Sequence, residues 1–402
     1  MQKTEKINQS SKDNEGVLII APFFRPSIGG AESYIDRVSL RLAESGFKVY
    51  VHAYQPIVTN EAHGLSKEIS GNLEIRRYSW FGGDLFHRFL DNKAFIFLYM
   101  TPYLFLRVFV WMLFNHKNIS IIDSQGLNAA FMNRVLSFIF RKKRVSTVLA
   151  LYDFKSSKLF GAISSWALKN SDKVIVEIGK SESELNYLGI PSHKIVGFLW
   201  WGRHENFFFR DREIARNKTG MGSLKEFVVL FVGRAIKVKG ADIILEVAKR
   251  VDDVEFAFVT NDTGDIPDML RDAEKDYNNI KFVGEIDYQD LVWYYQSADV
   301  ICVPSNYEEN ATLVVSESIS CNKPVIISNR GSLPYMIDDT VGLIAEPNPD
   351  DFEEKIRYLS ENRQVVDSMS NNCVKYAEQN FGKKNLERVI SAYKNLCDGS
   401  KR

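Results

Sequence analysis

Cysteine is scarce in this chain of 402 residues, and its scarcity excludes two classes of protein. The four cysteines form no CxxC pair and have no histidine at metal-ligand spacing beside them; they are Cys302, Cys321, Cys373 and Cys397. This pattern excludes a disulfide framework and a cysteine-based zinc site. We predict buried or idle thiols in a reducing compartment.

The amino-terminal stretch, MQKTEKINQSSKDNEG, lacks the apolar core of a secretory signal. We therefore expect a cytoplasmic protein, with the inner face of the membrane as the one alternative location. Residues 1–14 are expected to be disordered because they are polar and terminal.

Common nucleotide-phosphate and metal motifs are also absent. The chain has no Walker A loop, no GxGxxG and no DxD-type metal motif, and its Asp pairs at 252–253 and 338–339 are interpreted as surface acids. We expect no metal, no cofactor and no nucleic-acid partner.

The chain is neutral as a whole, but its halves differ in charge. Residues 1–200 carry 25 Lys and Arg against 17 Asp and Glu, whereas the rest carries 26 against 34. Two interpretations stay open: a different partner for each half, or scatter between two ordinary surfaces. The length and a hydrophobic content of 45% suit two domains.

Short apolar runs alternate with amphipathic helical stretches along the chain, which predicts parallel α/β units. Continuous apolar runs indicate strands buried on both faces; they are residues 17–20, 47–51, 119–123, 145–151, 173–177, 226–232, 255–260, 280–283, 300–303 and 324–327. Helices are expected between them, at 31–45, 241–250, 288–297 and 313–321, and throughout 352–396. The pattern breaks at 197–210, so we predict domains at 1–200 and 201–380.

Residues 94–114 are apolar enough to span a bilayer and contain one charge, Arg107. We expect Thr101 and Pro102 to interrupt this run. The α/β pattern continues on both sides, which argues against a span. Two interpretations remain: a core helix, or an interfacial helix whose segment 94–117 meets anionic lipid together with the basic cluster 141–144.

The loop at 233–240 follows a predicted strand and opens a predicted helix. Gly233 and Gly240 permit a close backbone approach, while Arg234 and Lys239 place two cations beside a helix N-terminus. This arrangement is suited to a diphosphate. The alternative is a turn with solvated cations.

A second segment, 304–317, combines carboxylates with a helix start. Glu309 lies in the loop and Glu317 about one turn into the following helix. A carboxylate accepts paired hydrogen bonds from vicinal hydroxyls, as in ribose or a sugar ring, and the N–H groups of 310–313 can receive a phosphate. The alternatives are a favourable charge near a helix N-terminus for Glu317 and an exposed loop acid for Glu309.

Together these segments resemble a known family. Residues 309–317, Glu-Asn-Ala-Thr-Leu-Val-Val-Ser-Glu, resemble the E-x7-E motif of retaining glycosyltransferases of the GT-B fold, family 4 (glycosyl transferases group 1). Residues 231–234 with 239–240 resemble the family's phosphate loop, and residues 29–32, Gly-Gly-Ala-Glu, resemble its first N-terminal loop. The resemblance covers nearly the whole chain in the same order.

The resemblance implies an α/β protein with two tandem Rossmann-like, doubly wound domains that face each other across a cleft. The N-terminal domain binds the acceptor, the C-terminal domain binds a UDP- or GDP-linked sugar, and the helix at 381–402 crosses back to the N-terminal domain. The resemblance implies that Arg234 and Lys239 bind the diphosphate of the donor, Glu317 binds its ribose and Glu309 binds the transferred sugar. It implies that Gly284 and Ile286 line the site of the base. Backbone N–H donors are implied at Asn310, Ala311, Thr312 and Leu313, and a close approach of the backbone at Gly29, Gly30 and Gly233.

The expected reaction is transfer with retention and without a metal, in which Arg234 and Lys239 stabilise the leaving diphosphate. Two positions depart from the family. Tyr152 stands where the family has a catalytic histidine, and a tyrosine donates a hydrogen bond but is a poor base at neutral pH. Residues 201–204, Trp-Gly-Arg-His, replace the usual Asn-Gly-Val-Asp.

Three functions stay open from the sequence. The first is an active glycosyltransferase, with a lipid-linked glycan or polysaccharide precursor as acceptor. The second is a catalytically impaired binding subunit of the same fold. The third is a nucleotide-sugar epimerase or phosphorylase.

Overall fold

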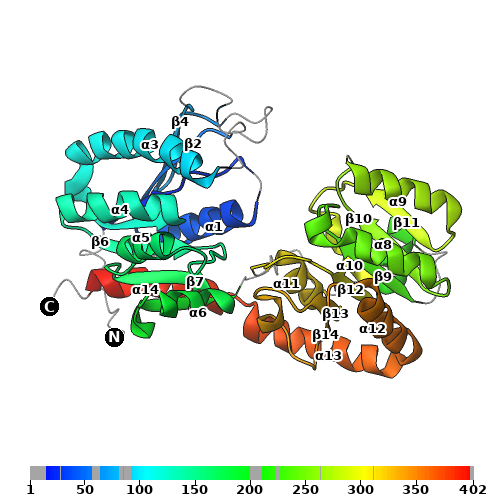
Figure 1. Ribbon diagram of the computed structural model, residues 1–402. Coiled ribbons are helices and arrows are strands. Elements are labelled where there is room, and N and C mark those ends of the chain that lie inside the picture. The colour runs from blue at the N-terminus through cyan, green and yellow to red at the C-terminus, as the bar shows by residue number, and fades with distance from the viewer. Residues whose placement is uncertain are drawn as a thin grey trace, which may run out of the picture. The chain divides into compact units, whose positions relative to one another are not determined.

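A computed structural model describes residues 15–27, 29–56, 64–80, 85, 92–199, 211–221, 227–262, 264–310 and 312–398. The chain divides into two compact units (Figure 1). Unit 1 comprises residues 1–176, 181–198 and 386–402; unit 2 comprises 177–180 and 199–385. Of the predicted features, residues 1–14 and 201–204 lie outside the described residues.

Unit 1 is built on a mostly parallel sheet of eight strands. In spatial order they are β3 (Lys67–Ser70), β4 (Leu73–Tyr78), β2 (Lys48–Tyr54), β1 (Gly16–Ile20), β5 (Ile119–Gln125), β6 (Lys143–Val148), β7 (Lys173–Glu177) and β8 (Ile195–Phe198). β3 pairs antiparallel with β4, and the pairs from β4 through β7 are parallel. The strand order reverses direction between β1 and β5, which is the switch point of this sheet.

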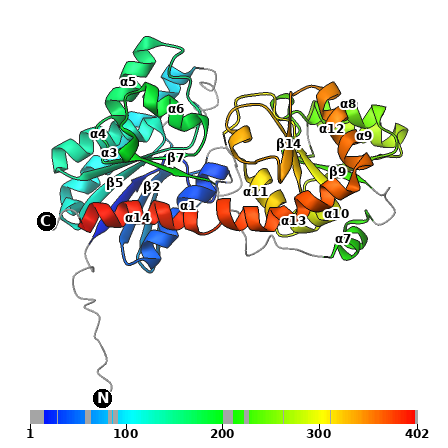
Figure 2. The same cartoon turned by 90° about the horizontal axis from the view of Figure 1, so that it is seen from below.

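Helices cover both faces of this sheet. One face carries α3 (Lys93–Asn115), α4 (Leu127–Phe140), α5 (Lys158–Leu168) and α6 (Lys180–Tyr187), and the other carries α1 (Gly30–Glu44) and α14 (Lys384–Asp398). Two 3₁₀ turns, η1 (His116–Asn118) and η2 (Ser192–Lys194), precede β5 and β8. Figure 2 shows α14 beside α1, where Arg41 pairs with Glu387 at 2.6 Å.

The long helix α3 is unbroken, so the prediction that Thr101 and Pro102 interrupt this segment is wrong. At this point the hydroxyl of Tyr54 forms hydrogen bonds with two backbone groups of the helix. It donates to the Met100 carbonyl at 2.7 Å and accepts from the Leu104 N–H at 3.1 Å. The hydroxyl thus bridges two backbone groups that would pair directly in a regular helix, and the helix continues through Pro102.

Unit 2 has a six-stranded sheet whose neighbouring strands are all parallel. Their order is β11 (Ile280–Gly284), β10 (Glu255–Val259), β9 (Val228–Val232), β12 (Val300–Val303), β13 (Val325–Ser328) and β14 (Gly342–Ala345). The direction of winding reverses between β9 and β12. The carboxyl ends of these two strands therefore lie side by side at the switch point.

Alternate residues of the unit 2 strands face two hydrophobic cores. Val229, Phe231 and Cys302 pack beneath α8 (Ala241–Arg250), α9 (Asp265–Asp276) and α12 (Pro349–Glu361). Leu230 and Ile301 pack on the opposite face, beneath α10 (Leu291–Ser297), α11 (Leu313–Ser320) and α13 (Arg363–Asn380). The short elements α7 (Arg212–Thr219), η3 (Lys237–Lys239) and η4 (Leu333–Tyr335) complete the unit.

The predicted doubly wound α/β class is confirmed in both units. All ten predicted strands and the predicted helices are present, with shifts of a few residues at their ends. The β3–β4 hairpin, β8 and β14 were not predicted. The four cysteines are buried free thiols, as expected.

Candidate active site

Two loops of unit 2 meet where β9 and β12 end side by side. The first comprises residues 233–240 after β9, and the second comprises residues 304–312 after β12. Because both strands are parallel, both loops emerge at the carboxyl edge of the sheet. In open α/β sheets this is the edge where ligands bind.

The side chains of Lys239 and Glu309 join these loops through an ion pair. Glu309 is buried, and its carboxylate also accepts hydrogen bonds from the hydroxyls of Ser305 and Tyr307, the latter at 2.8 Å. The Lys239 ammonium lies 5.2 Å from the centre of the Tyr307 ring. Three donors therefore hold the Glu309 carboxylate, and burial raises the pKa of Tyr307, so its phenol remains a donor.

Two glycines allow the backbone to approach closely at this point. Gly240 has φ +74°, and a Cβ there would lie 2.2 Å from the Pro304 carbonyl oxygen. Gly331 has φ +58°, and a Cβ there would lie 1.9 Å from the Glu309 carbonyl oxygen. The same carbonyl accepts the Ser332 N–H at 2.7 Å. The loop after β13 thus fixes the backbone of Glu309.

Arg234 differs from Lys239 in its surroundings. Its side chain is exposed, and among the described residues no carboxylate forms an ion pair with it. The loop around it is ordered by the Ala235 N–H, which donates to the Asn261 side chain at 2.8 Å, and by the Gly233 N–H, which donates to the Val259 carbonyl at 3.1 Å. A fixed loop therefore presents a guanidinium that an anion can reach.

Glu317 lies in the second turn of α11 and is buried. Its two carboxylate oxygens accept hydrogen bonds from the phenols of Tyr288 at 2.6 Å and Tyr295 at 3.0 Å. A carboxylate has about four lone-pair positions, so it can accept further bonds while both phenols stay in place. Burial raises the pKa of Tyr295 well above its usual value.

The remaining predicted donor contacts lie along the same edge. Gly284 ends β11 with φ +80°, and Ile286 packs partly buried against the core beneath α10 and α11. Thr312 occupies the N-cap position of α11, without a side-chain cap bond, the helix begins at Leu313, and Asn310 is partly buried. Ala311 lies outside the described residues. The predicted donor-binding residues of unit 2 thus lie along one edge of the sheet, from β11 across β9 to β12. Their contacts with a ligand stay predictions.

Unit 1 has a hollow of about 330 Å³ at the carboxyl edge of its own sheet. The hollow lies at the switch point between β1 and β5, and its walls come from the loops after β1, β5 and β6 and from α3. Its lining includes Phe23, Glu32, Ile96, Met100, Leu127 and Tyr152. Apolar atoms dominate the wall, with a carboxyl and a phenol among them.

Tyr152 is partly buried in this hollow and stacks on Phe154, with ring centres 5.6 Å apart. Its backbone N–H donates to Glu184 at 3.1 Å. Burial raises the pKa of Tyr152 above its ordinary value. The phenol therefore keeps its proton at neutral pH, which suits a hydrogen-bond donor and not a base.

The predicted glycines at 29 and 30 begin α1 beside the same hollow. Gly30 is the first residue of the helix, and Gly29 has an extended φ of 178° that any residue can adopt. Glu32, in the first turn of α1, lines the hollow, and burial raises the pKa of its carboxyl. Among the described residues, no group of three His, Cys, Asp or Glu side chains could hold a metal ion.

Several residues of these sites were not singled out from the sequence. They are Ser305, Tyr307, Tyr288, Tyr295, Gly331 and Ser332 in unit 2 and Glu32 in unit 1. Ser305 and Tyr307 lie in the same loop as Glu309, and Gly331 lies in the loop after β13. The carboxyl ends of the strands point to the loops 304–312 and 328–334 but not to individual side chains within them, and Tyr295 and Glu32 lie in helices, where this signal does not apply.

Comparisons with known proteins agree with this geometry. Residues 211–380 match the family described as glycosyl transferases group 1. A curated protein of Methanocaldococcus jannaschii, named uncharacterized glycosyltransferase MJ1178, is 28% identical over 173 residues, or 42% of this chain and 48% of that protein. Matches to several other curated relatives span 31% to 52% of those proteins.

Two solved structures resemble nearly the entire chain. Sucrose-phosphate synthase of Thermosynechococcus elongatus has a TM-score of 0.79 at 19% identity, covering 96% of this chain and 100% of that one. HepE of Anabaena, solved in complex with UDP, has a TM-score of 0.74 at 17% identity, covering 95% and 99%. The chain has the GT-B fold, and its residues 211–380 match the model of the glycosyl transferases group 1 family.

Proposed function

We propose that this protein is a retaining, metal-independent glycosyltransferase that uses a nucleoside-diphosphate sugar. The observation that carries the proposal is the paired Lys239 and Glu309 beside the exposed Arg234, at the switch point of a sheet in the matched family region. The UDP complex of HepE supports a uridine donor, and a GDP-linked sugar is the alternative.

The proposed chemistry follows from charge. When the bond between sugar and phosphate breaks, the leaving diphosphate gains negative charge and the sugar becomes cationic. Arg234 and Lys239 stabilise the diphosphate, and their charge does so without a metal ion. The Glu309 carboxylate then exchanges part of its contact with Lys239 for the hydroxyls of the transferred sugar, and Glu317 holds the ribose.

In the proposed reaction the acceptor attacks the sugar from the same face that the diphosphate leaves, so the configuration of the anomeric carbon is retained. The leaving phosphate oxygen accepts the proton of the acceptor hydroxyl, so the protein needs neither a nucleophile nor a strong base. This agrees with Tyr152, whose pKa is raised by burial and which serves as a donor to a sugar hydroxyl. The hollow in unit 1 is proposed to bind the acceptor, a glycan on a lipid carrier, because its wall is mostly apolar around Glu32 and Tyr152.

A panel of UDP- and GDP-linked sugars tests the proposal, with release of free nucleoside diphosphate as the readout. We expect slow hydrolysis of one donor, lost in Glu309→Gln, and transfer when lipid-linked glycans are added. Lys237→Ala is the matched control, because Lys237 is exposed in the same loop. Donor binding without turnover, even with acceptor present, would replace the proposal with a binding subunit, which the tyrosine at position 152 favours. An epimerised sugar or a sugar phosphate would indicate an epimerase or a phosphorylase.

A further inference from the structure

One side of unit 1 exposes apolar side chains of α3. Met100, Leu104 and Val108 are buried against the sheet. The side facing away from the sheet carries large apolar residues that are more than a third exposed; they are Phe95, Leu98, Leu106, Val110, Leu113 and Phe114. A helix on a soluble surface would carry polar residues there.

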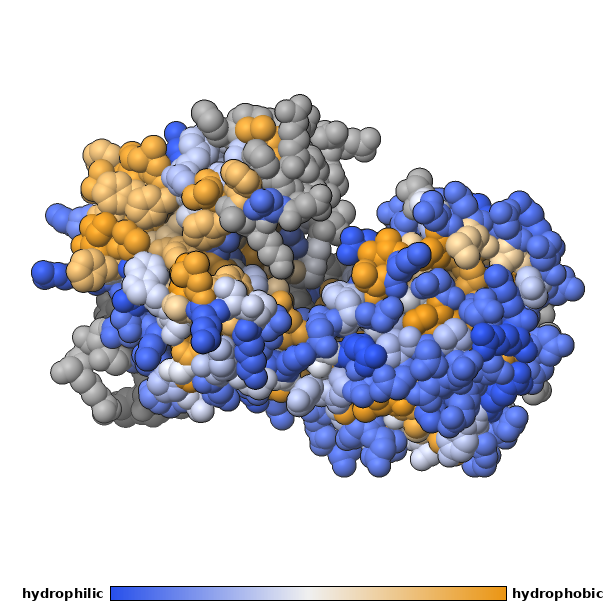
Figure 3. Space-filling model, in the orientation of Figure 1, coloured by the Kyte–Doolittle hydropathy of each residue, from blue (hydrophilic) through white to orange (hydrophobic). Residues whose placement is uncertain are grey.

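Neighbouring helices continue this apolar surface. α4 contributes Phe138, 85% exposed, and Ile139, and α5 contributes Leu159 and Trp166. Aromatic contacts show that the three helices lie side by side: Phe97 on Phe131 at 5.0 Å and Phe131 on Trp166 at 5.7 Å. Figure 3 shows hydrophobic residues gathered over α3 and α4. We call this surface, formed by α3, α4 and α5, the apolar face.

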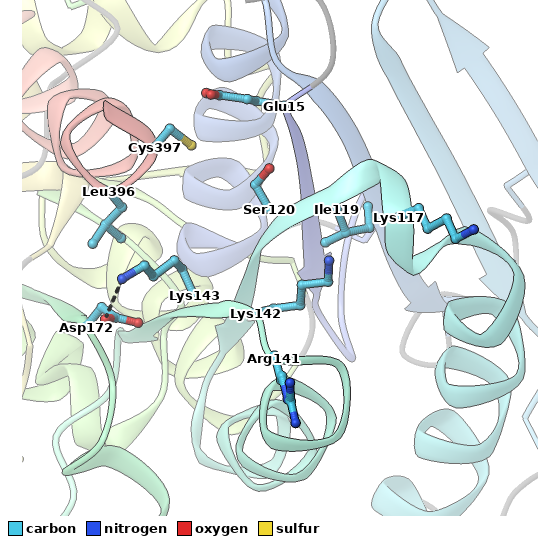
Figure 4. A pocket seen from close by; sticks show the side chains of 10 residues that line it. All are labelled: Glu15, Lys117, Ile119, Ser120, Arg141, Lys142, Lys143, Asp172, Leu396 and Cys397. Atoms are coloured by element: carbon cyan, nitrogen blue, oxygen red, sulfur yellow. Dashed lines mark ion pairs between the residues drawn. The ribbon is translucent and has the colours of Figure 1, made fainter. Parts of the chain in front are cut away.

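Basic residues border the apolar face at the carboxyl ends of α3 and α4. Lys117 precedes β5, and Arg141 and Lys142 precede β6. They line a hollow of about 580 Å³, together with Lys143, which pairs with Asp172 at 3.7 Å (Figure 4). Among the described residues, no carboxylate forms an ion pair with Lys117, Arg141 or Lys142.

The charge of this region points to one kind of partner. Residues 93–169 contain eleven Lys and Arg but two acids, Asp123 and Asp153, and Asp123 is buried; the hollow itself is also lined by the acids Glu15 and Asp172. Burial lowers the pKa of Lys142, as expected for an ammonium without a counter-ion. Arg144 is not part of this rim, contrary to the sequence prediction. Its side chain is buried and donates to the Ala167 carbonyl at 2.5 Å.

A membrane span by α3 does not fit the fold. Residues Phe95–Asn118 are long and apolar enough to cross a bilayer. However, β4 before the helix and β5 after it belong to one sheet, and α3 packs on that sheet. The helix must therefore lie along its sheet, which leaves the opposite side available to a surface.

We propose that unit 1 docks on a bilayer rich in anionic phospholipid, with the apolar face entering the acyl boundary and Lys117, Arg141 and Lys142 binding head-group phosphates. An interfacial helix with a basic border is the arrangement that such surfaces bind. The amino-terminal part of α3 also lines the acceptor hollow through Ile96 and Met100. Docking thus places that hollow near lipid, although the docking does not depend on the transfer reaction.

Flotation of the purified full-length protein with vesicles tests the docking without any sugar donor. We expect binding to vesicles containing phosphatidylglycerol, weaker binding to pure phosphatidylcholine, and weakening by salt. Each basic side chain near an anionic surface contributes about fivefold in affinity, so the triple variant Lys117→Glu, Arg141→Glu, Lys142→Glu, which also adds three repelled carboxylates, should bind at least about a hundredfold more weakly. The control reverses Lys48, Lys194 and Lys375, which makes the same change in net charge elsewhere.

The apolar contribution is tested by Phe114→Ser with Phe138→Ser, which should weaken binding to both kinds of vesicle. Ile69→Ser with Leu65→Ser removes exposed apolar side chains from another part of unit 1 and should bind as the wild type does. Matching thermal unfolding of all variants checks the fold. Absence of wild-type flotation, or equal flotation of wild type and both test variants, would overturn the proposal. So would a wild-type dimer that Phe138→Ser dissociates without changing vesicle binding, because the face would then join two copies of the chain.

Discussion

The Lys239 ammonium and the Glu309 carboxylate connect the loop after β9 with the loop after β12. The carboxylate is buried and accepts further hydrogen bonds from Ser305 and Tyr307, so three donors fix its position. The pair thus keeps both side chains in position at the switch point, where a diphosphate would compete for Lys239 and a sugar hydroxyl for Glu309.

Replacing Lys239 with Ala tests this pair. We expect kcat/KM for the donor to fall by about 10²- to 10³-fold, because one group that stabilises the leaving diphosphate is lost. The free energy of unfolding should also fall, by about 1–3 kcal/mol, since the buried Glu309 loses a partner. Donor kinetics and denaturant unfolding measure the two effects, with Lys237→Ala as control. Full turnover in Lys239→Ala would remove this residue from the site.

A comparison of Gly331→Ala with Gly71→Ala distinguishes the effect of backbone strain from the effect of displacing Glu309. Both have positive φ, +58° and +56°, but a Cβ at Gly71 meets nothing within 4 Å, whereas one at Gly331 meets the Glu309 backbone. Each change to Ala should cost about 1 kcal/mol from strain. Only Gly331→Ala should also lower turnover, by about a hundredfold, because it moves Glu309. Equal turnover in both variants would contradict the positioning of Glu309 by this loop.

Tyr152 is expected to act as a hydrogen-bond donor in transfer. Tyr152→Phe should lower kcat/KM for transfer by about tenfold, the effect of one neutral hydrogen bond. Tyr152→His should introduce a pH dependence near about 6.5 that the wild type lacks, because an imidazole titrates there. Transfer assays across pH measure both, and Tyr187→Phe is the control at an exposed tyrosine of unit 1. Unchanged transfer by Tyr152→Phe would exclude the role.

The stability of unit 1 should depend on pH through Asp123. Burial raises the pKa of this carboxyl to about 7, although hydrogen bonds from Tyr393, Gln125 and Thr147 oppose the shift. Between the unfolded pKa of about 4 and this value, the folded state holds a proton that the unfolded state has released. Stability should therefore fall as pH rises through this window, by up to roughly 1.4 kcal/mol per pH unit, and level off above it.

Asp123→Asn isolates this contribution because the amide does not titrate. As the pH rises from about 5 to 7, the unfolding free energy of the wild type should fall relative to that of this variant. Denaturant unfolding at several pH values measures it. Parallel stability curves for the two proteins would show that the Asp123 pKa is not raised.

Much of the fold could be predicted because its parallel strands are buried on both faces and appear as apolar runs. The β3–β4 hairpin could not, since segments such as Lys67–Ser70 are exposed and polar. The loops containing Arg234, Lys239 and Glu309 were found because each follows an apolar run. The contact of Gly331 with Glu309 was missed because it joins residues separated in sequence, and the letters RKKR do not show that Arg144 points inward while Arg141 remains exposed.

The return of α14 to unit 1 has a consequence for synthesis of the chain. Tyr393 donates to the buried Asp123 at 2.9 Å, across 270 residues that include all of unit 2. During translation, residues 1–198 leave the ribosome long before their last helix exists. Unit 2 can therefore complete its own core first. Until α14 is synthesised, unit 1 lacks the helix that contacts β5, and a groove is left open there. Chaperones that bind nascent chains would meet that groove, and a fragment ending at residue 198 would keep it.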